Sequence, residues 1–444
     1  MALALDHPFV IIGAGLAGLA CAERLGERAL VLEREAQVGG LARTVARGAF
    51  RFDYTGHWLH VASPLVERLL HELRLTDLVR IERRADIHSY GVRTPYPFQA
   101  HTYGLPAKVA ADCVLGYFAA REAAQKSTTP PRSFEDFIMR RLGDGIARHF
   151  MRPYNTKLWT VPPAALDCAW CDAFVPTPTP EEVVQGALAP EGSGHALGYN
   201  ASFWYPKEGG IGVLAETLSS KGKAEVRART AATRVCWRTR RLSCSDGTTL
   251  PYDVLVSTMP LIELVRMLEE PPEAVVRAAA SLRAASVTYW DIGLPRAAAP
   301  GAAHWTYFPE PAVPFYRIGS PSAVSPSMAP PGCRSLYVEA AHPLGTSPPA
   351  DDASVLRALR AVGLVAADEE PTLFSRQCID YAYVIMDHEY GVARGVILDW
   401  LERQGILSVG RYGAWTYQAM EGSLLDGMRA ADKAGLIAQE RALA

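Results

Sequence analysis

The sequence FVIIGAGLAGLACAERLGERALVLE, residues 9–33, decides the fold of the N-terminal part of the chain. It begins with a short apolar run at Phe9–Ile12, which is typical of a buried parallel strand. A glycine-rich turn follows, then apolar residues at helical spacing over Leu16–Leu25 and a second apolar run at Ala29–Leu32. The order strand, turn, helix, strand predicts a βαβ unit with parallel strands. This is the context in which a glycine-rich turn indicates ligand binding.

Three glycines in the turn, Gly13, Gly15 and Gly18, have the spacing of a dinucleotide-binding site. The first permits a tight turn, the second lets the backbone approach a pyrophosphate, and the third lets helix and strand pack closely. The N-terminus of the following helix offers N–H groups and a partial positive charge to phosphates. Glu33 lies about 20 positions after the first glycine, where a carboxylate accepts hydrogen bonds from a ribose hydroxyl and favours adenosine without a 2′-phosphate.

A second glycine-rich run, GGLART at residues 39–44, follows this unit. Paired glycines admit a cofactor, and Arg43 can pair with its pyrophosphate. The run resembles the second FAD-binding signature of the amine oxidase, protoporphyrinogen oxidase and sugar mutase flavoproteins. The resemblance implies FAD, and it argues against two alternatives: NAD as the tightly held cofactor, and a purely structural glycine turn.

The rest of the chain predicts an α/β protein in which a Rossmann-like FAD-binding domain carries a helical insertion and a second, mainly antiparallel sheet domain. At 444 residues the chain is long enough for two or three domains. We expect the FAD-binding domain at 1–105, 199–260 and 401–444, the helical insert at 106–198 and the antiparallel-sheet substrate domain at 261–400. Apolar periodicity predicts helices at 64–80, 106–126, 133–150, 261–280, 352–365, 390–404 and 424–441. Strands are expected after residue 224 and at 254–258, 285–294, 303–320, 334–342 and 407–410, and loops at 176–180, 190–200 and 321–333.

Composition excludes several classes of protein. The net charge is −2 and no long basic run occurs, so we expect no nucleic-acid partner. Eight scattered cysteines suit a reducing cytosol, and the lone CxxC at Cys168 and Cys171 favours packing over a metal site. No basic segment precedes the first apolar run, and no uncharged stretch reaches the roughly 18 residues of a membrane span. We therefore expect a soluble, cytoplasmic protein with no signal peptide, no membrane partner and no metal.

Several later segments occur in a specific order: PYPFQ (95–99), MRPYNTKLWTVP (151–162), YNASFWYPKEGG (199–210), WTYFPEPAVPFYRIG (305–319) and GRYGAWTYQ (410–418). Together they are similar to UDP-galactopyranose mutase, in particular to its eukaryotic-type branch, over almost the whole chain. Gly56 and His57 resemble the flavin-facing histidine loop of that family, which lies near N5 of the isoalloxazine. The resemblance and the glycine-rich runs assign cofactor contacts to Gly13, Gly15, Leu16, Ala17, Gly18, Glu33, Arg34, Gly39, Gly40, Leu41, Ala42, Arg43, Gly56, His57, Gly410 and Ser423.

Two arginines, Arg317 and Arg411, stand in apolar or aromatic surroundings. An unpaired arginine is unfavourable to bury, so two of them near a cofactor suggest clamps for an anionic ligand. Structural salt bridges are the alternative. The family carries its diphosphate arginines at the matching positions. The resemblance further implies a substrate pocket formed by Tyr96, Phe98, Gln99, Asn155, Trp159, Trp305, Tyr307, Tyr383 and Tyr417, although each aromatic residue taken alone could equally belong to the core.

The resemblance implies an unusual use of the flavin. Reduced FAD, with NAD(P)H or another reductant as electron source, would attack the anomeric carbon of a UDP-sugar through N5. The resulting covalent adduct would open and reclose as a furanose, with His57, Arg317 and Arg411 as the catalytic residues. The alternatives are an FAD oxidoreductase of the amine oxidase or protoporphyrinogen oxidase type and a non-catalytic flavoprotein.

The C-terminal segment departs from the family. The path from Tyr417 to Ser423 is short, and Tyr383 is followed by Val-Ile-Met rather than by a proline-containing run. Ser423 is expected to cap the last helix. Both departures bear on the sugar end of the pocket, so the sugar, the base and the oligomeric state stay open.

Overall fold

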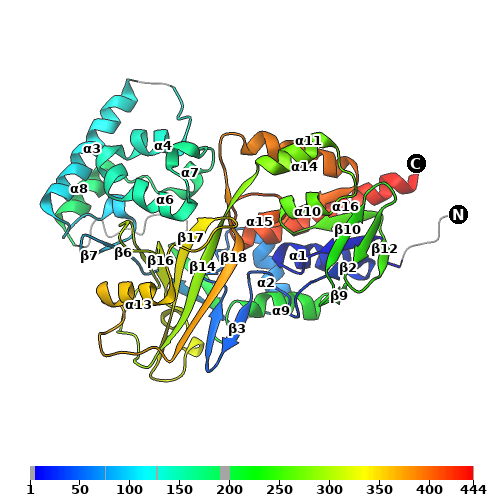
Figure 1. Ribbon diagram of the computed structural model, residues 1–444, viewed down its shortest axis with the longest axis horizontal. Helices are drawn as coiled ribbons and strands as arrows, with labels where there is room; N and C mark the ends of the chain where they lie inside the picture. The colour runs from blue at the N-terminus through cyan, green and yellow to red at the C-terminus, as the bar shows by residue number, and fades with distance from the viewer. Residues whose placement is uncertain (1–5, 76, 127–128, 191–200, 444) are drawn as a thin grey trace.

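The predicted βαβ unit forms the centre of a five-stranded parallel sheet in the computed structural model of the chain (Figure 1). The structure describes residues 6–75, 77–126, 129–190 and 201–443. The strands predicted at Phe9–Ile12, Ala29–Leu32 and 254–258 are confirmed, and all three are buried along their whole length. The third ends at Ser257 and pairs beside the first in the same sheet. Helix α1 (Leu16–Leu25) packs against α16 (Met420–Leu443). The strand order is β19 (Ile406–Ser408), β13 (Val254–Ser257), β1 (Phe9–Ile12), β2 (Ala29–Leu32) and β9 (Glu225–Arg227).

The second sheet has seven strands, and its neighbours pair antiparallel except for β15 and β6. Alternate residues of its long strand β14 face opposite sides, as the pleat requires. Trp290 and Ile292 pack into a core with α13 (Asp352–Ala361), whereas Val287 and Tyr289 line a cavity on the other face. The strand order is β18 (Leu373–Ile385), β14 (Arg283–Leu294), β17 (Arg334–Pro343), β16 (Arg317–Gly319), β15 (Trp305–Tyr307), β6 (Ala85–Ser89) and β7 (Val92–Pro95).

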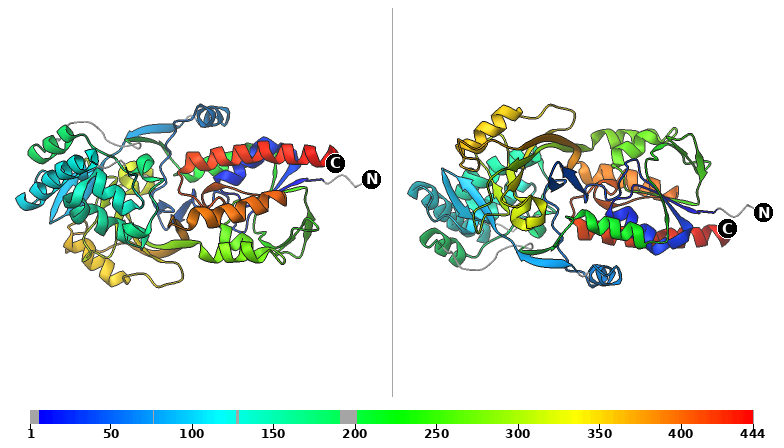
Figure 2. Two further views of the ribbon diagram at one scale, coloured as in Figure 1. Left: turned by 90° about the horizontal axis from the view of Figure 1, so that it is seen from above. Right: turned by 90° about the horizontal axis from the view of Figure 1, so that it is seen from below.

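A group of helices stands at one end of the molecule, and the parallel sheet stands at the other, as both views of Figure 2 show. Lys157 attaches these helices to the seven-stranded sheet: its Nζ donates to the carbonyls of Phe308 at 2.7 Å and Phe315 at 2.6 Å. The group comprises α3 (Ala107–Gln125), α4 (Phe134–Arg141), α5 (Gly143–Ile146), a π-helix (Ala147–Met151), α6 (Arg152–Trp159), α7 (Cys171–Phe174) and α8 (Pro180–Leu188).

Smaller elements connect these parts. The buried carboxylate of Asp53 accepts hydrogen bonds from Thr44 Oγ1 (2.6 Å), the Tyr205 hydroxyl (2.6 Å) and Ile211 N (3.2 Å), which joins the β3–β4 hairpin to a segment far along the chain. Within the described residues, no helix combines the length and the apolar character that crossing a bilayer requires. The connecting strands are β3 (Thr44–Arg47), β4 (Phe50–Asp53), β5 (Leu78–Glu82), β8 (Ser202–Pro206), β10 (Ala232–Cys236), β11 (Arg241–Cys244) and β12 (Thr249–Pro251). The connecting helices are α2 (Pro64–Glu72), α9 (Gly212–Lys221), α10 (Leu261–Met267), α11 (Glu273–Ser281), α12 (Pro321–Val324), α14 (Tyr390–Arg403) and α15 (Gly410–Gly413).

The single helix predicted at 64–80 is wrong in its second half. Helix α2 ends at Glu72, and residues 78–82 form strand β5 because β8 pairs with them from far along the chain. The prediction at 261–280 is wrong in the middle, where Pro271 and Pro272 separate α10 from α11.

The single helix predicted at 133–150 is broken for a packing reason. Gly143 has a φ of 83° and lies against α3, where a Cβ atom would stand 2.1 Å from the carbonyl oxygen of Gly116. The chain therefore ends α4 at Arg141, starts again as α5 and widens into the π-helix.

The strand predicted at 303–320 is wrong in its centre, because only its two ends, β15 and β16, are strands. The loop predicted at 321–333 contains the short helix α12. The loop at 176–180 ends at Thr179, which caps α8 in a capping box. Residues 191–200 of the remaining predicted loop lie outside the described residues.

Candidate functional site

One cavity of about 1080 Å³ runs from the turn after β1 to the helical group. It is lined by the parallel sheet at one end and by β14, β18 and α6 at the other. Every residue that the sequence assigns to the cofactor or the substrate lines this cavity except Gly18 and Phe98. Phe98 is fully buried and stacks on Phe150, with ring centroids 5.0 Å apart, so it supports a cavity-lining ring from behind. The cavity therefore contains both predicted sites as one continuous space.

The three turn glycines differ in what surrounds them. Gly13 has a φ of 97°, which favours glycine. A Cβ on Gly18 would lie 1.9 Å from the carbonyl oxygen of Gly13. This position therefore has no room for a side chain, and glycine lets the helix pack closely on the turn. A Cβ on Gly15 would meet nothing nearer than the Cα of Gly40, at 3.9 Å. Of these three positions, Gly15 is the one where the protein leaves space beside the backbone for a ligand.

Glu33 directly follows the second strand, and its carboxylate lies at the edge of the cavity. One oxygen accepts from Ala14 N at 2.8 Å and the other from Glu35 N at 2.9 Å, and the residue is 6% exposed. Each carboxylate oxygen can accept a further hydrogen bond. This arrangement fixes the carboxylate while leaving acceptor capacity, which fits the two hydroxyls of a ribose.

Arg43 has an unsatisfied donor in the cavity wall. Its guanidinium lies over the ring of Tyr54, with Cζ 4.7 Å from the centroid, and Nη2 donates to the Tyr54 hydroxyl at 3.0 Å. Its buried Nε has no hydrogen-bond partner among the residues that the structure describes. A buried cationic donor without an acceptor fits an anionic or carbonyl group of a bound cofactor. The donor set at this end of the cavity therefore fits FAD.

His57 lines the same cavity within electrostatic reach of Arg317 and Arg411. Burial lowers the pKa of His57 to about 4, and the positive charges of Arg411 and Arg317 act in the same direction. Its buried Nδ1 has no hydrogen-bond partner in the described part of the chain. The ring is therefore neutral at physiological pH and offers one hydrogen-bonding atom to a ligand in the cavity.

We expect His57 in the apoprotein to stay neutral down to about pH 5. Because its folded pKa lies below the unfolded value of 6.5, its cost to stability grows as the pH falls from 6.5 towards 4 and is absent above that range. The cost is at most about 3 kcal/mol, an upper bound because the residue borders a cavity that water can enter. NMR titration of the ring nitrogens tests this. A midpoint at or above 6.5, or a His57→Gln variant with the same acid sensitivity as wild type, would contradict it.

Arg317 and Arg411 differ in how their charges are balanced. Arg317 forms a two-contact ion pair with Glu339, with Nη2 donating to Oε1 at 2.8 Å, and Glu339 is 1% exposed. Arg411 donates to the carbonyls of Gln418 at 2.8 Å and Ala382 at 3.2 Å, and no carboxylate among the described residues pairs with it. Arg317 therefore forms the structural salt bridge that was the alternative interpretation of both arginines. Arg411 forms none with the described residues and keeps a full positive charge on the cavity wall.

The two guanidinium groups converge on a group of tyrosines. Arg411 Cζ lies 5.6 Å from the ring of Tyr383 and 4.6 Å from that of Tyr417. Arg317 Cζ lies 5.6 Å from the ring of Tyr316, whose hydroxyl is 3.3 Å from the Tyr383 hydroxyl. Burial raises the pKa of Tyr383 to about 12, although the charge of Arg317 lowers it. The arginines therefore lie on the same part of the wall, among hydroxyl groups that stay protonated.

Two buried amide side chains, Gln99 and Asn155, line the cavity. Gln99 Nε2 donates to the Pro176 carbonyl at 2.6 Å, and Asn155 Nδ2 donates to the Met151 carbonyl at 2.7 Å. Both amide groups are thereby fixed, and their oxygens are available as acceptors. The rings of Tyr96 and Tyr307 lie nearby, with centroids 5.3 Å apart. The sequence prediction did not include Tyr154, which lines the same space although it stands next to Asn155 in the chain.

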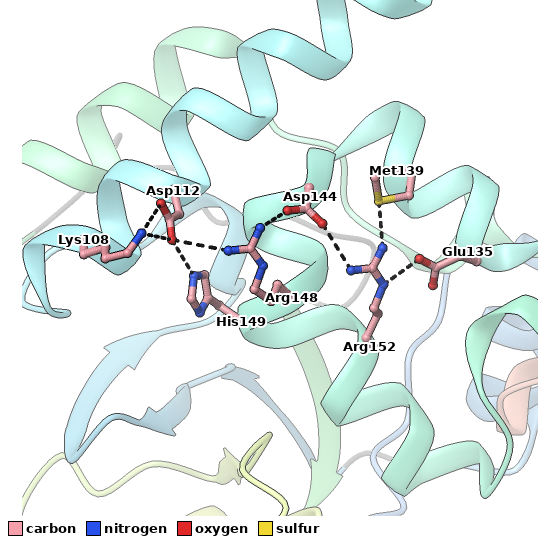
Figure 3. Close-up of polar contacts among 8 residues, drawn as sticks. All are labelled: Lys108, Asp112, Glu135, Met139, Asp144, Arg148, His149 and Arg152. Carbon is pink, nitrogen blue, oxygen red and sulfur yellow. Dashed lines mark hydrogen bonds and ion pairs between the residues drawn. The ribbon is translucent and has the colours of Figure 1, made fainter.

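The π-helix links this wall to a polar network on the outside of the helical group (Figure 3). Single-turn π-helices often occur at functional sites. Inward-facing Phe150 and Met151 line the cavity. On the outside, Lys108 of α3 and side chains of the π-helix and α6 contact carboxylates of α3, α4 and α5. They form a continuous chain of Lys108, Asp112, His149, Arg148, Asp144, Arg152 and Glu135.

Ser423 lies on the cavity but does not cap the last helix. Helix α16 begins at Met420, and Ser423 N already donates to the Ala419 carbonyl. Its hydroxyl accepts from Gln418 Nε2 at 3.3 Å. The capping interpretation is wrong because the helix starts one turn earlier than the sequence pattern indicated.

The parallel sheet, the glycine turn and this cavity define the chain as a flavin-binding protein of a known family. The family model of flavin-containing amine oxidoreductases matches residues 16–434, and the chain belongs to that family. The predicted FAD-binding α/β fold with its second, mainly antiparallel sheet is confirmed.

Solved structures give a finer comparison. The structure of a reduced UDP-galactopyranose mutase superimposes with a TM-score of 0.90 and 27% identity, covering 98% of this chain and 95% of that one. A putative protoporphyrinogen oxidase from Exiguobacterium sp. 255-15 gives a TM-score of 0.73 and 17% identity over 97% and 99% of the two chains. Putrescine oxidase bound to putrescine gives 0.66 and 17% over 98% and 99%. The last two show a shared fold only, and the first confirms the resemblance to UDP-galactopyranose mutase.

Proposed function

We propose that the protein is an FAD-dependent mutase that interconverts the pyranose and furanose forms of a UDP-sugar. The observation that carries the proposal is the convergence of Arg317 and Arg411 in one cavity with a dinucleotide turn. The N–H donors that remain on the two guanidinium groups, together with the tyrosine hydroxyls around them, suit a diphosphate. The similarity to UDP-galactopyranose mutase supports the same substrate class. A cytoplasmic location and NAD(P)H or another reductant as electron source belong to the proposal.

FAD, when bound and reduced, supplies the nucleophile that takes the sugar from its diphosphate. The chain itself holds the diphosphate through Arg411 and Arg317 while negative charge develops on it as the anomeric C–O bond breaks. Glu339 keeps Arg317 in place, and Arg411 contributes the uncompensated charge. Neutral His57 can donate or accept a hydrogen bond at the cofactor without adding charge.

The acceptor atoms of Gln99 and Asn155 favour a base with an N–H on its edge. Their NH₂ groups are held by backbone carbonyls, so the free oxygens accept from a donor such as N3–H of uracil. The rings of Tyr96 and Tyr307 provide faces for the base.

The alternative is an FAD oxidoreductase, which the family model also covers. An amine oxidase must accept a substrate whose protonated form is a cation. Here Arg411 presents a positive charge on the cavity wall, and this charge disfavours an ammonium group at short range. The charge on this part of the cavity wall therefore favours an anionic substrate over an amine.

We expect dithionite-reduced holoprotein to convert UDP-galactopyranose, or another UDP-hexose, to its furanose form, with no net consumption of reductant. Chromatography of the nucleotide sugars measures the product, and the oxidised protein is the matched control. If only the oxidised protein turns over, and peroxide accumulates with the product, the oxidoreductase alternative replaces the mutase.

A further inference from the structure

A second cavity of about 320 Å³ lies behind the segment that carries Arg411. It is formed by α14, strand β19, residues 414–418 and α16. The proposed mutase reaction uses no residue of this cavity except Gln418, which lines both cavities. Its volume is sufficient for a small ligand.

Two of the three basic side chains that line this cavity form ion pairs, and the third does not. Arg429 pairs with Asp426, and Lys433 pairs with Glu402 at 2.5 Å. Arg394 has no carboxylate partner in the described part of the chain, and its one hydrogen bond there runs from Nε to the carbonyl of Ala414. Both terminal nitrogens of this half-buried guanidinium therefore lack a protein acceptor among the described residues. Such a fork fits a carboxylate or a phosphate.

The segment between the cavities faces both of them. Ala414, Thr416 and Gln418 line the second cavity, whereas Arg411 and Tyr417 line the first. Arg411 donates to the carbonyl of Gln418, so the same few residues position the guanidinium in the first cavity.

The backbone of this segment is also constrained. Trp415 is fully buried with a φ of 50°, a conformation that is rare for a large side chain. Strained residues of this kind persist only where the surrounding structure holds them in place, and they cluster at ligand-binding and switch regions. Arg394 contacts this segment directly, through its hydrogen bond to the carbonyl of Ala414.

We propose that the second cavity binds a small oxyanion through the terminal nitrogens of Arg394, with Arg429 and Lys433 beside it, and that this binding stabilises the arrangement of residues 410–418. The site goes beyond the proposed mutase function, because its ligand need not be substrate or product. The shared chemistry is that of an inorganic phosphate or a small dicarboxylate.

Calorimetric titration of inorganic phosphate and of succinate into FAD-loaded protein, at ionic strength held constant with chloride, tests the site and separates the two sources. We expect saturable binding of at least one probe, about tenfold weaker binding in Arg394→Leu, and partial recovery in Arg394→Lys. Glu402→Gln, a half-exposed position, should strengthen binding because it releases Lys433. Hydrogen exchange at residues 410–418 should slow when the probe is added to wild type and stay unchanged in Arg394→Leu.

The variant Arg411→Ala separates this site from the first cavity. Binding that persists in Arg411→Ala and weakens in Arg394→Leu supports the proposal whether or not the protein is a mutase. The reverse pattern, equal affinity in wild type and Arg394→Leu, or no binding of either probe would overturn it.

Discussion

The substitution Gly15→Arg is expected to abolish FAD binding while leaving the fold intact. Gly15 has an ordinary φ of −73°, and a Cβ there meets only the Cα of Gly40 at 3.9 Å, so a side chain can be accommodated in the empty protein. That side chain would fill the space through which a pyrophosphate reaches the N-terminus of α1. The loss of two charge-assisted hydrogen bonds alone weakens binding by about 3 kcal/mol, or more than about 100-fold.

Two further variants make this test specific. Gly18→Ala should instead lower the melting temperature, because its Cβ would stand 1.9 Å from the Gly13 carbonyl oxygen. Gly391→Arg, on the exposed start of α14 with open space around it, should leave both properties unchanged. The absorbance of bound flavin and thermal unfolding measure the two effects. Wild-type flavin occupancy in Gly15→Arg would remove the dinucleotide assignment.

The sequence pattern correctly predicted the βαβ unit, where apolar periodicity and glycine spacing indicate the same elements. The strands at Phe9–Ile12 and Ala29–Leu32 and the helix between them follow from apolar runs and glycine spacing alone. Strand β5 and the break at Gly143 were not predictable in this way. Pairing with residues 202–206 decides the first, and contact with Gly116 decides the second. Both depend on segments that only the folded chain brings together.

The same distinction applies to the site. Arg317 and Arg411 could be found from their aromatic surroundings, but the partner of Arg317 could not. Glu339 lies directly opposite Arg317 in the antiparallel register of β16 and β17. Recognising that pair requires the register of two strands of which one, β16, has only three residues. Once the register is known, cross-strand pairing of opposite charges is the expected arrangement.

Because Arg317 is paired with Glu339 and Arg411 has no such partner among the described residues, we expect alanine substitution of the two arginines to affect stability differently. Arg411→Ala is expected to weaken UDP binding by about 1.5–3 kcal/mol with little change in stability, since the guanidinium balances no carboxylate among the described residues. Arg317→Ala leaves Glu339 buried without its partner, which is expected to cost about 3–5 kcal/mol of stability in addition to any loss of UDP affinity.

The double variant Arg317→Met/Glu339→Gln separates the two contributions. Removing both charges should restore most of the stability lost in Arg317→Ala, because no isolated carboxylate remains buried. It should not restore UDP affinity if Arg317 also contacts the diphosphate. Urea unfolding and UDP calorimetry on the same preparations measure both quantities. Equal UDP affinity in wild type, Arg411→Ala and the double variant would mean that these arginines bind no diphosphate in the cavity. The chain would then be a flavoprotein of another activity.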